Sequence, residues 1–287
     1  MQSFEITTQK GKMHYWEDGE KSNLTIVCLH GLAGNGLYSF GELMPFLKEH
    51  FHLIILDSPG HGKTSAFLNE DDYLFSNLST WLEQAVGEIV DGPLYILGHS
   101  WGADVALHFT RFHLDRVLGL MLLDGGFTFP QNQPEMTFDY AYAGWNNYME
   151  QSAFANKEEI FQEYRTYTKR WDSRKELYAA SLFQKNQKGE MVLRTSKFTV
   201  LAIIHAFFKE PFADAYPFID VPTLLIYASH PVELDTARAK GILQLQENIE
   251  DITIEKIANS SHMLQWDKPE QTAALITKWI NAKNSSD

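Results

Sequence analysis

The sequence predicts an α/β fold, built on a mostly parallel, doubly wound sheet with helices on both faces and interrupted once by a helical insertion. Short apolar runs alternate with longer amphipathic patterns in the first half of the chain and again near its end. The apolar runs are continuous, which is typical of strands buried on both faces. Between residues 127 and 217 the alternation stops, and helical periodicity continues without a convincing buried strand.

The expected elements follow from the position of each run. A hairpin turns at Gly11, and Pro45 shortens or kinks the first helix, because proline lacks the N–H that a helix interior requires. The first half is expected to hold strands over 24–30, 51–57, 94–99 and 117–124, and helices over 73–90 and 101–112. After Pro222 we expect strands over 223–229 and 252–257 and helices over 234–246 and 269–282.

These elements predict a core domain formed by residues 1–127 and 218–287, with residues 128–217 inserted as a helical cap. A chain of 287 residues can bury one large core. The expected cap is rich in aromatic side chains, as is the segment that leads into it. Among them we expect Phe127, Phe129 and Trp145 to line a substrate site.

Composition excludes several classes of partner. The formal net charge of −13 argues against nucleic acid, because phosphate backbones are bound through clustered Lys and Arg. The longest apolar run, 200–208, is too short to span a bilayer, and the first residues lack the apolar segment of a signal peptide. We therefore expect a cytoplasmic protein without a membrane partner. Cys28 is the only cysteine, so neither a disulfide nor a cysteine-built metal site is expected.

Ser100 is the first candidate catalytic residue. It stands between an apolar strand and a helix, with Gly98 before it and Gly102 after it, in the pattern G-x-S-x-G. A sharp strand-to-helix turn exposes the hydroxyl and directs the helix N-terminus toward developing negative charge, and the crowding of that turn requires very small neighbours. Ser100 is therefore predicted to be a nucleophile.

A serine nucleophile needs a base, and His262 is the best placed of the histidines. It follows the last predicted strand, so it lies at the same carboxyl edge of the sheet as Ser100. His30 is expected to shape the turn after its strand and His61 to brace a loop. His99 should point away from Ser100, because adjacent residues on a strand face opposite sides.

Four motifs together resemble the α/β-hydrolase family over nearly the whole chain. They are LHGLAGNG after the first buried strand, LDSPGHGKT after the second, GHSWGA at the turn and SSHMLQWDKPE near the end. The resemblance implies a cap inserted after the strand that ends at Asp124. It also implies the chain order nucleophile, acid, histidine. In the same layout, the backbone N–H groups of Leu32 and Trp101 are expected to form an oxyanion hole.

The acid of the triad is where the chain departs from this family. Members usually place an aspartate after the strand that here reads TLLIYAS, but His230 or Pro231 occupies that position. Asp124 on the preceding strand is the favoured substitute and Glu233 is the alternative, whereas Asp235 is expected to cap the helix that it begins. Asp57 precedes Ser100, so it is interpreted as a residue that braces its loop.

The residues therefore predict a serine hydrolase that cleaves an ester-like bond of a small apolar substrate through an acyl-enzyme, without metal or organic cofactor. A carboxylic ester, lactone or thioester would suit this chemistry, and amide or C–C bonds stay open. Ser100 argues against haloalkane dehalogenases and epoxide hydrolases, which share the fold but use an aspartate nucleophile. A second hypothesis is a hydrolase-like receptor or signalling protein that binds a small ligand with little turnover. The oligomeric state is not predicted.

Overall fold

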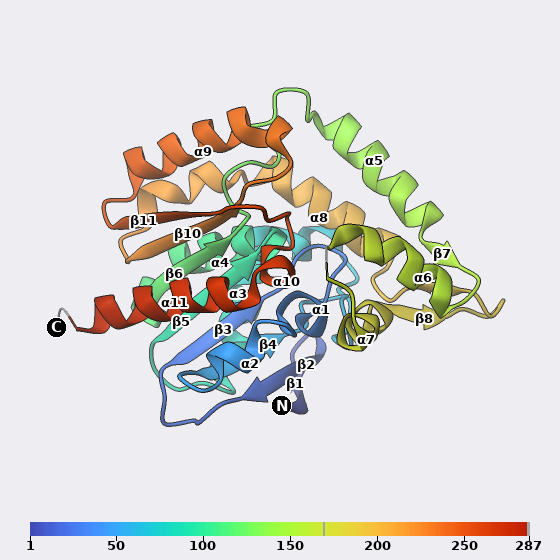
Figure 1. Ribbon diagram of the computed structural model, residues 1–287, viewed down its shortest axis with the longest axis horizontal. Helices are drawn as coiled ribbons and strands as arrows, with labels where there is room; N and C mark the ends of the chain where they lie inside the picture. Colours follow the sequence, from blue (N-terminus) through green and yellow to red (C-terminus); the bar gives the residue numbers. More distant parts are fainter. Residues whose placement is uncertain (169, 286–287) are drawn as a thin grey trace.

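A computed structural model describes residues 1–168 and 170–285. Its centre is a sheet of eight strands, in the order β1-β2-β4-β3-β5-β6-β10-β11 (Figure 1). Every neighbouring pair from β4 to β11 is parallel, and β1 and β2 pair antiparallel at one edge. The fold class expected from the sequence is confirmed. The strands are β1 Gln2–Thr8, β2 Gly11–Asp18, β3 Thr25–Leu29, β4 His52–Leu56, β5 Leu94–His99, β6 Val117–Leu123, β10 Thr223–Ala228 and β11 Ile252–Ile257.

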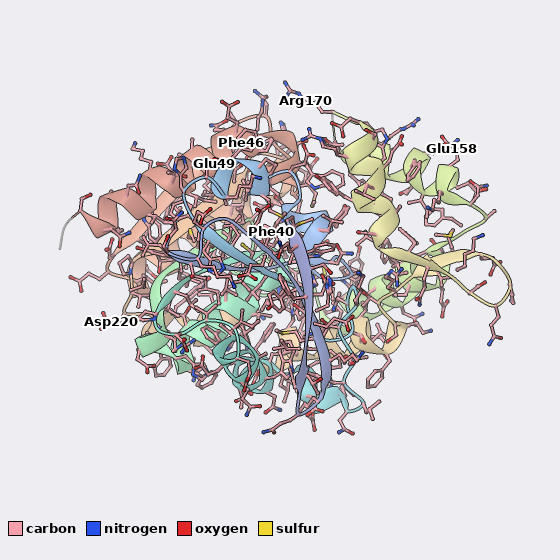
Figure 2. All side chains as sticks on the ribbon, turned by 90° about the horizontal axis from the view of Figure 1, so that it is seen from below. Phe40, Phe46, Glu49, Glu158, Arg170 and Asp220 are labelled. Atoms are coloured by element: carbon pink, nitrogen blue, oxygen red, sulfur yellow. The ribbon has the colours of Figure 1, made fainter. Side chains whose placement is uncertain are left out.

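Helices cover both faces of this sheet. The first face packs against α3 and α4 and the second against α1, α2 and α11, so the strands have an apolar core on each side. In Figure 2, Phe40 of α1 lies inside the molecule, where it contributes to the second core. The helices are α1 Gly36–Phe40, α2 Met44–Leu47, α3 Phe75–Gly87, α4 Trp101–Phe112, α9 Asp235–Asn248, α10 Leu264–Asp267 and α11 Pro269–Asn284. Short 3₁₀ turns occupy Glu70–Tyr73, Leu114–Arg116 and Val232–Leu234.

The segment between β6 and β10 contains strands that the sequence analysis did not predict. Three short strands pair antiparallel in the order β7-β9-β8, beside the helices of the segment. Each strand has only two or three residues, too few to produce a pattern of alternation. The elements are α5 Phe138–Gln151, β7 Ala153–Phe154, α6 Lys157–Tyr164, α7 Ser173–Ser181, β8 Phe183–Lys185, β9 Met191–Leu193 and α8 Lys197–Lys209, with 3₁₀ turns at Arg165–Tyr167, Phe212–Asp214 and Tyr216–Phe218.

The segment between β6 and β10 has one part that projects from the sheet and another part that packs in the core. Elements α5, α6 and α7 project to one side of the sheet (Figure 1), and Glu158 of α6 and Asp220 lie at opposite ends of the molecule (Figure 2). In contrast, Ile203 and Phe207 of α8 belong to the main core, which is the apolar core between the sheet and helices α3 and α4. The expected division into residues 128–217 and the remainder stays a prediction, since the last part of that segment shares the main core.

A buried ion pair joins α7 to the loop between α1 and α2. Lys175 Nζ lies 3.0 Å from Glu42 Oε2, and the two side chains are 3% and 4% exposed. Tyr178 on the same helix donates its hydroxyl hydrogen to the carbonyl oxygen of Gly41. These contacts fix α7 against the sheet domain.

The described residues contain no helix that is both long enough and apolar enough to cross a membrane. Cys28 is buried in the second core, and burial raises the pKa of its thiol. A thiol in that environment is a structural residue rather than a nucleophile.

Candidate active site

Ser100 occupies a strained turn between β5 and α4. Its φ of 54° lies in the left-handed region, which a residue with a side chain rarely adopts. A Cβ on Gly98 would lie 2.2 Å from the carbonyl oxygen of Gly102, and one on Gly102 would lie 2.1 Å from that of Leu29. Both distances are far below van der Waals contact. The crowding that the G-x-S-x-G pattern implies is therefore present on both sides of the serine.

A third glycine supports the same turn. A Cβ on Gly125 would lie 2.2 Å from the carbonyl oxygen of Ser100, so the loop after β6 packs directly on the serine backbone. The contact with Ser100 joins segments that are distant in sequence, and no local pattern encodes it.

His262 and Asp124 are hydrogen-bonded to one another. His262 Nδ1 lies 2.8 Å from Asp124 Oδ2, in the geometry of an imidazole N–H that donates to a carboxylate. Asp124 Oδ1 accepts a second hydrogen bond from the backbone N–H of Ala228, at 2.9 Å. Because β6 and β10 are adjacent, this second bond fixes the carboxylate at the edge where both strands end.

Among the described residues, neither of the two other candidate carboxylates is hydrogen-bonded to His262. Glu233 sits exposed in the 3₁₀ turn Val232–Leu234, and within the described residues it has no hydrogen bond to His262. Asp235 does not cap α9 as expected. Leu234 holds the N-cap position, and Asp235 is the first helical residue, where its Oδ1 accepts from Arg238 at 2.9 Å. Leu234 stays near the helical region, which leaves Asp235 inside the first turn.

His99 has a position that the sequence analysis did not anticipate. Its Nε2 lies 3.1 Å from the carbonyl oxygen of His262, to which it donates, and the two rings are 5.0 Å apart. Burial lowers the pKa of His99 to about 3, so the ring is neutral. His99 therefore holds the backbone of the loop that carries His262.

His30 and His61 make the loop contacts that the sequence analysis expected of them. His30 accepts at Nε2 from the backbone N–H of Ser58 and donates from Nδ1 to the carbonyl oxygen of Gly31. His61 accepts at Nε2 from the backbone N–H of Ala33. Burial lowers the pKa of both rings, so each has a free lone pair for this purpose.

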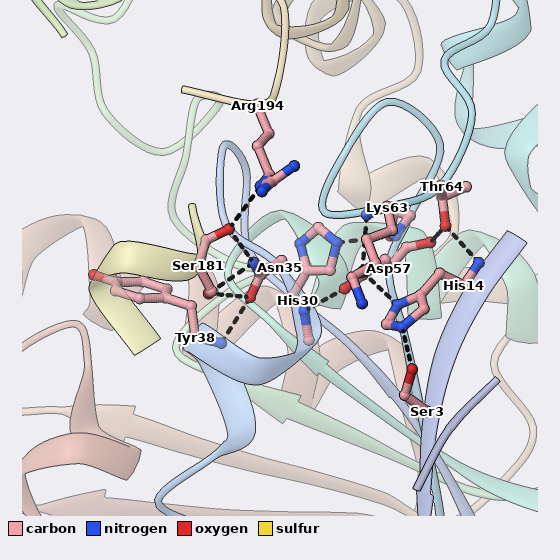
Figure 3. Close-up of polar contacts among 12 residues, drawn as sticks. Ser3, His14, His30, Asn35, Tyr38, Asp57, Lys63, Thr64, Ser181 and Arg194 are labelled. Atoms are coloured by element: carbon pink, nitrogen blue, oxygen red, sulfur yellow. Dashed lines mark hydrogen bonds and ion pairs between the residues drawn. The ribbon is translucent and has the colours of Figure 1, made fainter. Parts of the chain in front are cut away.

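Asp57 makes a separate set of hydrogen bonds, none of which involves Ser100 among the described residues. Its carboxylate accepts from the His14 ring at 2.7 Å and from the backbone N–H groups of Gly36 and Lys63, and Thr64 donates to its carbonyl oxygen (Figure 3). These contacts join β2, the start of α1 and the loop after β4. The role as a loop-bracing residue agrees with them.

The expected oxyanion-hole residues lie beside Ser100. Trp101 is the first residue of α4, and the Ser100 side chain makes no capping hydrogen bond, so the first N–H groups of the helix are left for a ligand. Leu32 follows Gly31, where a Cβ would lie 3.1 Å from Ser100 Cβ. The loop therefore passes close to the serine, and Leu32 and Trp101 line the same cavity.

Two cavities meet at Ser100. The small pocket, about 220 Å³, and the large pocket, about 560 Å³, share Ser100, His262, Leu32 and Trp145 as lining residues. The small pocket adds Phe129, Phe207, Asp104 and Arg238, whereas the large pocket adds Tyr38, Tyr148 and Tyr167. Of the expected substrate-binding residues, Phe129 and Trp145 line these cavities. The placement of Phe127 differs from the prediction: its ring is 1% exposed and packs in the core, so it lines neither pocket.

In the part of the chain that the structure describes, no group of three or more His, Cys, Asp or Glu side chains is arranged to hold a metal ion. What the site brings together is a serine on a strained turn and a histidine paired with a carboxylate, in a cavity that Leu32 and Trp101 also line.

Residues 25–269 match the family described as alpha/beta hydrolase fold, and the chain belongs to that family. It is 20% identical over 270 residues to the (E)-2-((N-methylformamido)methylene)succinate hydrolase of Acinetobacter baylyi, with 93% of each chain covered. It is 22% identical to epoxide hydrolase 3 of Xenopus tropicalis, covering 94% of this chain and 74% of that protein. The crystal structure of an E-2-(acetamidomethylene)succinate hydrolase superimposes with a TM-score of 0.79 at 18% identity, covering 97% and 98% of the two chains. This chain is thus a hydrolase by fold and by the names of its relatives.

Proposed function

We propose that this protein is a serine hydrolase that cleaves an ester-like bond of a small molecule through an acyl-enzyme. Ser100 is the nucleophile, His262 the general base and acid, and Asp124 the carboxylate that orients His262. The observation that carries the proposal is the hydrogen bond of 2.8 Å between His262 Nδ1 and Asp124 Oδ2, in a pocket that Ser100 also lines.

The bond to Asp124 assigns the two nitrogens of His262 different tasks. With the proton of Nδ1 donated to Asp124, Nε2 has the lone pair that can accept the proton of a serine hydroxyl. Ser100 Oγ then attacks the carbonyl carbon, and the resulting oxyanion accepts from the N–H groups of Leu32 and Trp101. His262 returns the proton to the leaving oxygen, and water attacks the acyl-enzyme by the same steps.

The proposed substrate is a small molecule with an apolar part. Phe129, Trp145 and Phe207 supply apolar wall on one side of Ser100, and burial of apolar surface is the main source of binding energy in such clefts. A carboxylic ester fits the oxyanion geometry, and a lactone or thioester would follow the same route. The two relatives named for succinate derivatives indicate that this fold also hosts hydrolysis of other bonds.

Epoxide hydrolysis is less well supported, although one relative carries that name. The fold performs that reaction with an aspartate at the position of Ser100. The hydrolase-like receptor gains weight from the departure at the usual acid position, which His230 or Pro231 occupies. The bond between Asp124 and His262 supplies a carboxylate from β6 instead, which favours turnover over simple binding.

A panel of 4-nitrophenyl esters of increasing acyl length tests the proposal. We expect turnover of the short esters by the wild type, its loss in Ser100→Ala, and labelling of the wild type but not the variant by a fluorophosphonate. Labelling without any turnover would support the receptor hypothesis. Turnover that survives in Ser100→Ala would contradict the proposed nucleophile.

A further inference from the structure

Asp104 is a buried carboxyl group in the wall of the small pocket, and the proposed mechanism does not use it. It lies in the first turn of α4, which begins directly after Ser100, and both residues line the small pocket. Its side chain is 2% exposed, and among the described residues its Oδ1 has no hydrogen-bond partner. A buried polar atom without a partner is costly, which is why native proteins contain few of them.

The surroundings of Asp104 favour the uncharged form of this carboxyl group. Burial raises the pKa of Asp104 well above its ordinary value, and the nearby backbone N–H groups of Asp104 and Gly126 offset this only in part. A neutral carboxylic acid has both a hydroxyl donor and a carbonyl acceptor. It therefore suits a neutral partner with the same two capacities, such as an alcohol.

A second buried polar group on the same helix serves as a comparison. His108 lies one turn beyond Asp104, is 1% exposed, and has an Nε2 without a partner among the described residues. Its ring stacks on Phe75, with 4.8 Å between the centroids. Asp104 lines the cavity that contains Ser100 and His262, whereas His108 lines none of the pockets described above.

We propose that Asp104 determines substrate specificity by hydrogen-bonding a hydroxyl group on the acyl part of the substrate, which occupies the small pocket. This inference rests on the proposed ester hydrolysis and narrows its substrate class to hydroxyacyl esters. The cavity of about 220 Å³ holds only a short acyl chain. Asp104 and Ser100 both line this cavity, so the hydroxyl group and the carbonyl carbon of one short acyl chain can reach the two residues.

An isosteric pair of esters tests the inference, because a hydroxyl and a methyl group have similar size. The substrates are three 4-nitrophenyl esters: those of (R)-3-hydroxybutyrate, of (S)-3-hydroxybutyrate and of 3-methylbutyrate, which has no stereocentre. We expect wild-type kcat/KM to favour one hydroxylated enantiomer by about ten- to a hundredfold, since a site built for a hydroxyl rejects an analogue that lacks it. Asp104→Leu should reduce this ratio to about one while the 3-methylbutyrate ester is still hydrolysed.

His108→Leu is the matched control, because it removes a buried polar group from the same helix outside the pocket and should keep the wild-type ratio. If Asp104→Leu does not fold, judged by circular dichroism and thermal melting, Asp104→Ala takes its place. If neither folds, the wild-type ratio alone decides.

Equal kcat/KM values of the wild type for the 3-methylbutyrate ester and for both 3-hydroxybutyrate esters, or an unchanged ratio in a folded Asp104 variant, would overturn the assignment of Asp104. If these rates disappear in Ser100→Ala, the proposed hydrolysis nevertheless stands. Absence of hydrolysis of every ester would overturn both.

Discussion

Replacement of Asp124 by asparagine changes the hydrogen bonds of His262 in a way that can be worked out atom by atom. In the wild type, Asp124 Oδ1 accepts from the Ala228 N–H at 2.9 Å and Oδ2 accepts from His262 Nδ1 at 2.8 Å. An asparagine has only one acceptor oxygen. If that oxygen keeps the Ala228 bond, the NH₂ group faces Nδ1, and His262 must then carry its proton on Nε2.

That tautomer cannot accept the proton of Ser100. We therefore expect Asp124→Asn to lower kcat/KM by roughly 10³- to 10⁴-fold, equivalent to about 4 to 5.5 kcal/mol of transition-state stabilisation. The melting temperature should change little, because the Ala228 bond and the side-chain shape are kept.

Steady-state hydrolysis of a 4-nitrophenyl ester measures the loss, with Glu233→Gln as the control. Glu233 is exposed and has no hydrogen bond to His262 among the described residues, so its variant should stay within about threefold of the wild type. An Asp124→Asn variant near wild-type activity, together with a large loss in Glu233→Gln, would refute the assignment of the acid.

Three further changes have defined outcomes. His99→Phe removes the donor to the His262 carbonyl and should lower kcat about tenfold with KM nearly unchanged, whereas an equal rise in KM would indicate a defect in substrate binding. Gly102→Ala places a Cβ 2.1 Å from a backbone oxygen and should cost about 3 kcal/mol or more in urea unfolding, and unchanged stability would contradict the crowding. Burial lowers the pKa of His99 to about 3 and of His108 to about 4, below the value of about 6.5 in an unfolded chain. The unfolded chain therefore binds more protons, and the free energy of unfolding should fall between about pH 6.5 and 4, by up to about 1.4 kcal/mol per pH unit for each ring. His108→Leu should reduce that slope by one such increment, and an unchanged slope would show that His108 does not titrate in this way.

The central sheet could be predicted from the sequence because its parallel strands are short apolar runs that can be recognised locally. Continuous apolar runs such as 94–97 are buried on both faces, and their alternation with helices indicates a parallel sheet. The short strands β7, β8 and β9 have no comparable pattern. Two or three residues cannot establish a period, and their pairing depends on neighbours that are distant in the chain.

One part of the candidate site could be predicted from a short stretch of sequence. Ser100 stood out as the candidate nucleophile because Gly98 and Gly102 lie two residues on either side of it, and the crowding of a sharp turn requires such small neighbours. The partner of His262 is 138 residues away, so the sequence left Asp124 and Glu233 as alternatives, and only the register of β6 beside β10 distinguishes their positions. The bond from His99 to the His262 carbonyl crosses 163 residues, and no pattern signals it.

The position of Phe127 could not be predicted from the sequence. Its aromatic side chain was compatible with either a pocket wall or a core, and composition cannot separate the two. Gly241 of α9 passes so close to it that a Cβ there would lie 1.9 Å from the Phe127 carbonyl oxygen and 3.1 Å from its ring, and the ring is buried in the core. The location of this aromatic residue, which directly precedes the expected cap, thus depends on contacts with a helix that is distant in sequence.

The ion pair between Lys175 and Glu42 couples the substitutions that the chain can accept at these two positions. Loss of Glu42 leaves Lys175 as an uncompensated charge away from water, which costs about 3–5 kcal/mol, whereas loss of Lys175 leaves Glu42 with Arg174 Nη2 at 3.6 Å. Simultaneous replacement of Glu42 and Lys175 by apolar residues of similar volume is often neutral. In a set of homologous sequences, chains that have lost the carboxylate at position 42 should therefore also have lost the cation at position 175.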